Sequence, residues 1–188
     1  MTRERPDARA ALLAAAREEL AEHGHSSIGL RAVARRAGLS HAAPTYVFSD
    51  RAGLLTAVAT EGFVELTEAL RAVPADAEPR LEALGHAYVD FGLHHRALFD
   101  LMFRSVELDQ TDEALLTAQS ESIGVLLEAI DTGDPDESHS LVLTSWALVH
   151  GLVVLARDGA LGGATDPAVD ATDQAHRLVG FFSTLTAR

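Results

Sequence analysis

Cysteine is absent from the 188 residues of this chain, and so is lysine. Without cysteine the chain has no disulfide framework, no thiolate metal site and no thiol nucleophile. The sequence also has no G-x-S-x-G elbow, no phosphate-binding P-loop and no H-E-x-x-H pair. These absences remove most signatures of catalysis, and we expect neither catalytic residues nor a cofactor.

Positive charge is scarce and unevenly distributed. All 15 basic residues are arginines, against 28 aspartates and glutamates, for a formal net charge of −13. Residues 1–60 nevertheless hold 8 arginines against 6 acidic residues, whereas residues 61–188 hold 7 against 22. Because a polyanion is attracted to positive surface, any contact with nucleic acid is expected in the first third of the chain.

Long hydrophobic runs are rare as well. Residues 138–156 contain no Asp, Glu, Lys or Arg, but serine, threonine and histidine interrupt the run and its flanks are mostly acidic. A membrane span favours about 20 strongly apolar residues with basic flanks, so a buried helix is the preferred interpretation and a span the alternative. The first nine residues are polar and do not resemble a secretory leader. We therefore expect a soluble, cytoplasmic protein without a membrane partner.

Helical periodicity covers nearly the whole chain, with proline and glycine at the breaks, and strand-like alternation never extends beyond a few residues. Helix starts are signalled by Asp50, by Asp134-Pro135 and by Asp166-Pro167, and Gly24 has the position of a C-terminal glycine. These patterns predict an all-α fold of about nine helices. The expected helices cover residues 7–22, 30–36, 41–47, 51–73, 80–94, 97–106, 112–130, 134–157 and 166–185.

Residues 29–48, GLRAVARRAGLSHAAPTYVF, predict two short helices joined by a tight turn. Gly38 marks the turn, and the hydroxyl of Ser40 is expected to cap the second helix. Two short helices around a turn with glycine form a helix-turn-helix, whose second helix enters the DNA major groove. A plain helical hairpin with a solvated arginine face is the alternative that spacing alone leaves open.

The side chains of this segment suit DNA. Small alanines allow the second helix to approach closely, polar side chains can reach base edges, and arginines lie where phosphates would run. The expected DNA-binding residues are Gly29, Arg31, Arg35, Arg36, Ser40, His41, Ala42, Ala43, Thr45, Tyr46 and Arg51.

The same stretch and its flanks resemble the N-terminal domain of the tetracycline-repressor (TetR) family of regulators. The resemblance lies in ALLAAAREELAEHG, in LRAVARRAGLS, in YVF and in DRAGLLTAV. Two positions depart from the family pattern. Val47 stands where the family usually has a histidine and cannot donate to a phosphate, whereas Arg51 replaces a usual lysine and keeps its charge.

The second half, with YVDFGLHHRALFDLMF and WALVHGLVVLARDGAL, resembles a subgroup of that family with a tryptophan and a His-Gly pair on its eighth helix, here Trp146 and His150-Gly151. The resemblance implies an all-α homodimer. Residues 1–52 would form a three-helix DNA-binding domain and residues 53–188 a ligand-binding and dimerisation domain. A fourth helix would connect the two, with a linker near residues 74–79.

Several polar residues of the second half could form a metal or ligand site. His86, Asp90 and His94 repeat at a spacing that could present metal ligands on one helix face. At 100° per residue they oppose the apolar stripe of that helix, as a solvated face would, so we expect no metal there. His150 lies on an apolar helix and is expected to be a hydrogen-bonded core histidine, with ligand contact as the alternative.

An effector pocket in the second half would be mostly apolar with a few polar anchors, such as His150, Tyr88 or Ser145. The acidic balance of this half favours a small neutral or cationic hydrophobic molecule. Each candidate also fits plain core packing. The candidate ligand-binding residues are Tyr88, Phe91, Leu98, Met102, Phe103, Trp146 and His150.

Together these features predict a transcriptional regulator that binds double-stranded DNA. The preferred hypothesis is a ligand-inducible repressor that binds a palindromic operator as a homodimer. A DNA-binding dimer without an effector, and less strongly an all-α enzyme that uses its C-terminal histidines, are the alternatives.

Overall fold

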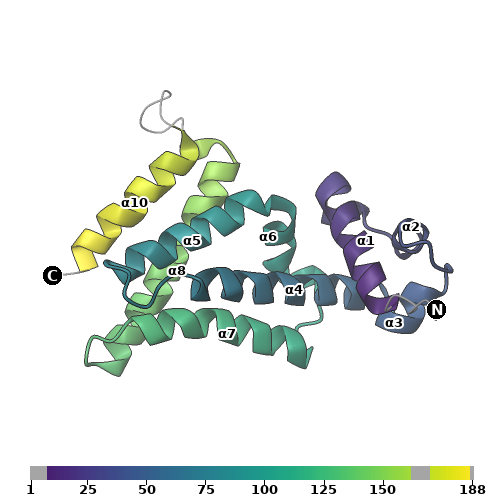
Figure 1. The fold of residues 1–188 in the computed structure, drawn as a ribbon, viewed down its shortest axis with the longest axis horizontal. Helices are drawn as coiled ribbons and strands as arrows, with labels where there is room; N and C mark the ends of the chain where they lie inside the picture. Colours follow the sequence, from purple (N-terminus) through teal and green to yellow (C-terminus); the bar gives the residue numbers. More distant parts are fainter. Residues whose placement is uncertain (1–7, 162–169, 187–188) are drawn as a thin grey trace, which may run out of the picture. The chain divides into compact units, whose positions relative to one another are not determined.

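The computed structural model describes residues 8–161 and 170–186, and within these ranges the chain forms nine α-helices, two short 3-10 helices and no β-strand (Figure 1). The prediction of an all-α fold is confirmed. The helices are α1 (Ala8–His23), η1 (His25–Ser27), α2 (Leu30–Arg36), α3 (Ala43–Phe48), α4 (Arg51–Arg71), α5 (Arg80–His94), α6 (Arg96–Met102), η2 (Ser105–Glu107), α7 (Glu113–Ala129), α8 (Pro135–Arg157) and α10 (Ala171–Thr186).

Most helix boundaries agree with the sequence patterns, because the capping signals operate as expected. The Asp134 carboxylate accepts hydrogen bonds from the backbone N–H groups of residues 136 and 137, and the Asp50 carboxylate accepts one from residue 53. Gly24 has a positive φ of 72° after α1, a conformation that glycine adopts without strain.

The predictions were inaccurate at the start of α3 and at the end of α6. Helix α3 begins at Ala43 rather than at residue 41, and its N-cap is Ala42, so the predicted cap by the Ser40 hydroxyl is wrong. Instead the Ser40 carbonyl accepts the Ala43 N–H across a turn. The helix predicted over residues 97–106 ends at Met102 and is followed by η2.

The last helix has a capping residue that the sequence patterns missed. The predicted start at Asp166-Pro167 and the loop glycines 162 and 163 lie outside the described residues. The described helix α10 begins at Ala171, and the Asp170 carboxylate accepts hydrogen bonds from the N–H groups of Thr172 and Asp173.

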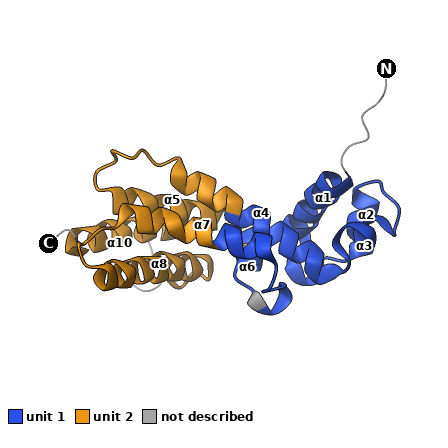
Figure 2. Cartoon of the chain, turned by 90° about the horizontal axis from the view of Figure 1, so that it is seen from below, with its two compact units in different colours: residues 1–63, 97–119 blue, residues 64–96, 120–188 orange. Residues whose placement is uncertain are grey.

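By their contacts the residues fall into two compact units (Figure 2). Unit 1 consists of residues 1–63 and 97–119, and unit 2 of residues 64–96 and 120–188. This division follows packing. The functional boundary after residue 52 stays a prediction, and the expected linker at residues 74–79 lies between α4 and α5.

In unit 1, α1 packs against both α2 and α3. Leu12 and Leu20 of α1, Val33 of α2 and Phe48 of α3 are buried in this three-helix core. Elsewhere in the unit, α6 packs closely on α4 at Gly62. A Cβ added at this position would lie 2.7 Å from the Met102 sulfur. The helix-turn-helix is therefore held on a small apolar core of its own.

In unit 2, α5, α8 and α10 pack against one another. Gly85 of α5 allows the closest approach, because a Cβ at this position would lie 2.6 Å from Val179 of α10. Thr67 and Ser122 share a buried hydrogen bond of 2.8 Å between their hydroxyl oxygens.

α8 is the one helix in the described part of the chain that is long and apolar enough to cross a membrane. One face, which includes Val142, Val149 and Val153, is buried in unit 2, as a core helix requires. The opposite face leaves Leu143 and Leu155 exposed. The prediction of a buried helix is thus right for one face only.

Candidate nucleic-acid interface

The turn between α2 and α3 has the geometry that the sequence requires. Gly38 has a φ of 67°, the Leu39 N–H donates to the Ala34 carbonyl at 2.9 Å, and the Gly38 N–H donates to the Arg35 carbonyl at 3.1 Å. This pair of bonds ends a helix on a left-handed glycine. The turn fixes the direction in which α3 leaves α2.

α3 has one buried and one exposed face. Pro44 and Phe48 are buried against the rest of the three-helix core, and Thr45 and Tyr46 point to solvent. Tyr46 is 93% exposed, which is unusual for a large aromatic side chain. His41 and Ala42, in the turn before α3, are exposed as well. The sequence-predicted readout residues therefore lie on one accessible surface.

The predicted phosphate contacts fall into two groups. Arg31 and Arg35 are exposed on α2, beside the recognition helix. Arg36 is instead paired with α1: its Nε donates to Glu19 at 2.7 Å, and its other nitrogens bind Glu18 and Glu22. In this structure Arg36 joins α2 to α1, so a phosphate contact by this residue stays a prediction.

The junction between α3 and α4 is a strained, tight connection. Ser49 has φ 68° and ψ −57°, and the Asp50 N–H donates to the Phe48 carbonyl at 2.8 Å, which defines a γ-turn of the strained kind. Gly53 lies directly under this turn, since a Cβ there would lie 2.1 Å from the Phe48 oxygen. Only glycine fits at position 53 without moving the end of the recognition helix.

Arg51 binds groups within unit 1. Its Nε donates to the Ile28 carbonyl at 2.9 Å, and its Nη2 donates to the His25 carbonyl at 2.6 Å and to Glu107 of η2 at 3.2 Å. The His25 ring lies 3.0 Å from the same carboxylate. Burial raises the pKa of Glu107, but His25 and Arg51 outweigh it, and the pKa lies below its ordinary value. The part of Arg51 in phosphate binding stays a prediction.

Among the candidate ligand residues, three form a cluster in unit 2. The Trp146 Nε1 donates to the Tyr88 hydroxyl oxygen at 3.2 Å, and the Tyr88 hydroxyl lies 3.1 Å from the His150 Nδ1. Burial, and then Arg157, lowers the pKa of His150, which favours the neutral ring. Burial likewise raises the pKa of Tyr88. The expected hydrogen bond of His150 is confirmed.

The remaining candidates lie elsewhere. Leu98, Met102 and Phe103 belong to unit 1, where the Phe103 ring contacts Phe63 at 5.4 Å between centroids. Phe91 is buried in unit 2 and packs on the His95 ring. The seven candidates are therefore divided between the two units, and their role in ligand binding stays a prediction.

The expectation that His86, Asp90 and His94 form a solvated face is wrong for His86, which packs on α10, whereas the Asp90 side chain is 47% exposed. The His86 ring stacks on His176 of α10 at 4.5 Å, and the His176 Nε2 lies 3.0 Å from the Asp90 carboxylate. His94 is exposed, and its Nδ1 lies 2.7 Å from the Asp90 carbonyl. The contribution of His176 was not visible in the sequence, because this residue is 90 positions away from His86.

An exposed polar helix face after a glycine turn, flanked by exposed arginines on the preceding helix, defines a helix-turn-helix DNA-binding protein. Comparison with known families agrees with this class. Residues 12–58 match the bacterial regulatory proteins of the tetR family, and residues 81–182 match the tetracyclin repressor-like C-terminal domain. The chain belongs to the TetR family of transcriptional regulators.

Solved structures show the same fold. A protein of unknown function from Rhodococcus sp. RHA1 is 30% identical, with a TM-score of 0.81 and coverage of 98% of this chain and 97% of that chain. A tetR-family regulatory protein from Rhodococcus RHA1 is 21% identical (TM-score 0.67; 96% and 97% covered), and a possible TetR-family regulator from Streptomyces coelicolor A3(2) is 19% identical (TM-score 0.63; 94% and 95% covered). No curated protein matches the chain.

Proposed function

We propose that this regulator is a cytoplasmic, ligand-inducible repressor that binds a palindromic operator as a homodimer. Residues 1–52 would bind DNA, and residues 53–188 would bind the effector and form the dimer. The observation that carries the DNA-binding half of the proposal is the accessible surface of α3. There His41, Thr45 and the 93%-exposed Tyr46 offer hydrogen-bonding groups to base edges.

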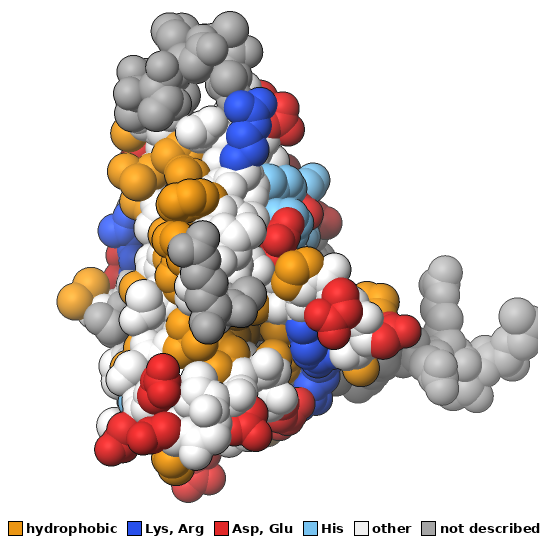
Figure 3. All heavy atoms as spheres, turned by 90° about the vertical axis from the view of Figure 1, so that its left-hand side faces the viewer, with side chains coloured by type: hydrophobic (Ala, Val, Ile, Leu, Met, Phe, Trp, Pro, Cys, Tyr) orange, Lys and Arg blue, Asp and Glu red, His pale blue; other side chains and the backbone are white. Residues whose placement is uncertain are grey.

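An exposed apolar surface supports the homodimer. α8 exposes Leu143 and Leu155, and α10 exposes Phe181 (61%) and Leu185 (49%). Figure 3 shows hydrophobic side chains gathered in a band on the face that carries the C-terminal end of α10. A soluble monomer rarely exposes so many large apolar side chains on neighbouring helices, and a second copy of the chain would cover them.

Induction would act through the spacing of the two recognition helices. A two-fold dimer reads half-sites roughly 34–36 Å apart, so a change of a few ångströms misaligns one half-site. A ligand that prefers the misaligned state shifts the population by its differential affinity, typically about 1–3 kcal/mol. The same coupling requires that operator DNA weakens ligand binding by an equal factor.

DNA binding is tested by selecting an operator from random-sequence DNA and measuring affinity by fluorescence anisotropy over a range of salt concentrations. Arg31→Ala and Arg35→Ala should each lower the slope of log affinity against log salt by about 0.9 per subunit. Thr45→Ala and Tyr46→Ala should lower the affinity for the selected operator more than the affinity for random DNA. Arg96→Ala, which removes an exposed arginine outside the interface, is the control and should change neither quantity. No preference for any DNA sequence would refute the proposal.

The homodimer is tested by sedimentation. Phe181→Glu and Leu155→Glu each place a carboxylate on an exposed apolar position of α10 or α8 and should convert the dimer into folded monomers. Leu116→Glu alters a leucine of similar exposure (47%) on α7 of unit 1 and should leave the dimer intact. A wild-type protein that sediments as a monomer would contradict this part of the proposal.

A further inference from the structure

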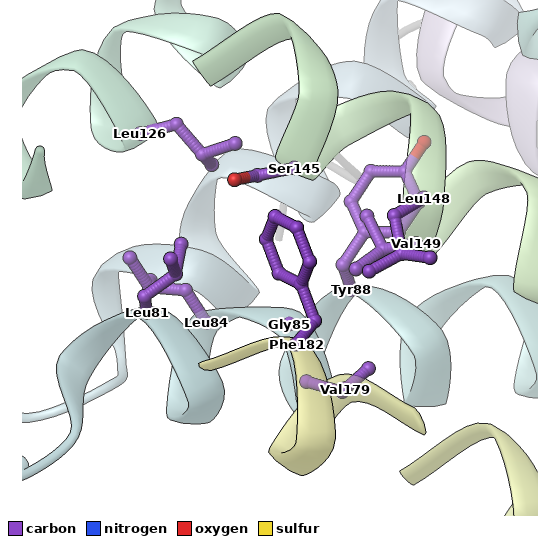
Figure 4. Close-up of a pocket in the computed structure, with 10 residues that line it drawn as sticks. All are labelled: Leu81, Leu84, Gly85, Tyr88, Leu126, Ser145, Leu148, Val149, Val179 and Phe182. Atoms are coloured by element: carbon purple, nitrogen blue, oxygen red, sulfur yellow. The ribbon is translucent and has the colours of Figure 1, made fainter. Parts of the chain in front are cut away.

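Helices α5, α7, α8 and α10 enclose a hollow in unit 2 whose wall is almost entirely hydrocarbon (Figure 4). Leu84, Leu126, Val149 and Val179 contribute one side chain from each helix, and no charged side chain of the described residues lines it. The hollow measures about 380 Å³ when the open space at its mouth is included, but its enclosed part has room for about one water molecule.

One polar group faces this hollow without a partner. Ser145 of α8 is 3% exposed, and its hydroxyl oxygen has no hydrogen-bond partner among the described residues. Figure 4 shows the hydroxyl directed into the space beside Leu126 and the Phe182 ring. The second hydroxyl of the lining, on Tyr88, is already bonded to Trp146 and His150.

An unpaired hydroxyl in an apolar wall costs folding free energy unless a partner reaches it. A water molecule is a poor partner here, because buried waters need two to four polar neighbours and this wall offers one. An organic molecule that is apolar over most of its surface and carries one hydrogen-bonding group matches the wall better. A cation would find no carboxylate in the lining and would be buried unpaired.

The Phe182 ring limits the space for such a molecule. The ring projects from α10 into the middle of the lining residues, and the side chain is only partly buried. A ligand of more than a few atoms needs the volume that the ring now fills. Displacement of one partly exposed ring is a smaller change than separation of the buried faces of α5 and α10.

We infer that this hollow, the Ser145 pocket, binds a small uncharged ligand with an aromatic or aliphatic body and one hydroxyl or carbonyl group. That group bonds to the Ser145 hydroxyl, and the body takes the place of the Phe182 ring. The inference rests on the proposed effector function and narrows the ligand from neutral or cationic to neutral. Apart from Tyr88, none of the seven residues proposed from the sequence lines this pocket.

Four probes of similar shape test the inference on the full-length protein: benzyl alcohol, toluene, benzylammonium and benzoate. Binding is followed by calorimetry and by emission of Trp146, the single tryptophan, which is hydrogen-bonded to a residue of the lining. Phe182→Ala should bind benzyl alcohol and toluene about 10-fold more tightly than the wild type, because no ring has to move. The two charged probes should not bind to any variant.

The hydroxyl is tested by Ser145→Ala in the Phe182→Ala background. This change should lower the affinity for benzyl alcohol by about 2- to 12-fold, the range expected for one hydrogen bond, and leave the affinity for toluene unchanged. Ser140→Ala is the matched control, since it removes an exposed hydroxyl of the same helix that bonds to the Asp136 carbonyl. It should change neither affinity.

Each other outcome overturns the inference: no neutral probe binds, charged probes bind as well as neutral ones, or Ser145→Ala leaves benzyl alcohol binding intact. Circular dichroism verifies folding, and Phe182→Leu replaces Phe182→Ala if the latter is unfolded. Operator binding is measured on the same samples, so that a failure of the pocket inference can be distinguished from a failure of the proposed DNA-binding function. A protein that binds its operator but none of the probes refutes only the pocket.

Discussion

Gly53→Ala tests the close contact between the end of the recognition helix and the start of α4. The added Cβ would lie 2.1 Å from the Phe48 carbonyl oxygen, whereas ordinary contact begins at 3.4 Å, so the backbone must move by about 1.3 Å. Overpacking of this kind costs about 1–3 kcal/mol, and the helix preference of alanine over glycine offsets about 0.5–1 kcal/mol. The midpoints of these ranges leave a net loss of unfolding free energy of about 1 kcal/mol, or a fall in Tm of about 2–4 °C.

The same displacement moves α3, so operator affinity should fall by about 10-fold, the effect of losing roughly one base contact. Thermal unfolding and fluorescence anisotropy measure the two effects. Gly124→Ala is the matched control in α7, because no atom lies within 4 Å of its added Cβ, and it should gain about 0.5–1 kcal/mol without changing DNA binding. If Gly53→Ala were as stable as the wild type and bound the operator equally well, the argument from close contact would be refuted.

Three further predictions concern unit 2. Ser145→Ala should raise the unfolding free energy by about 1 kcal/mol beyond the gain of Ser140→Ala, because it removes a buried hydroxyl without a partner; denaturant titration measures this, and a loss of stability would contradict it. Tyr88→Phe should cost about 1 kcal/mol and change the emission of Trp146, since the indole N–H and the His150 ring lose their shared partner. Burial lowers the pKa of His150, so below about pH 6.5 the unfolded chain binds a proton more readily than the folded protein does. The contribution of His150 to the free energy of unfolding is therefore fully present above about pH 6.5 and falls below it. His150→Gln should flatten this part of a curve of stability against pH, and an unchanged curve would argue against a depressed pKa.

Local signals predicted the fold well, because each depends on residues close in sequence. The Asp134 cap, the left-handed Gly38 and the two short helices of the DNA-binding motif follow from the chemistry of a few neighbouring positions. The start of α3 was placed too early for the same reason. Ser40 is a good capping residue in isolation, but the chain forms one more turn before Pro44 enters the helix.

Features that depend on residues far apart in sequence could not be predicted. The helical projection of α5 predicted that His86 faces solvent, but His176 of α10 packs on the His86 ring. Ser145 was one of three possible polar anchors in the sequence argument, but the helices that surround its hydroxyl, α5, α7 and α10, could not be predicted. A projection describes the directions in which side chains leave a helix, whereas burial depends on which other helices cover each direction.

For the arginines of the DNA-binding motif, contacts with residues far apart in sequence could not be predicted, and these contacts affect function. Arg31, Arg35, Arg36 and Arg51 are equivalent in a sequence argument, since each carries one positive charge near the expected groove. In the structure Arg36 is bound to the carboxylates of α1, and Arg51 to the His25 carbonyl and to Glu107, 56 residues away. A guanidinium whose donors are already occupied must give up those partners before it binds a phosphate. Arg31 and Arg35 therefore make the cleaner test of DNA contact, whereas loss of Arg51 would disturb the folding of unit 1 and DNA binding together.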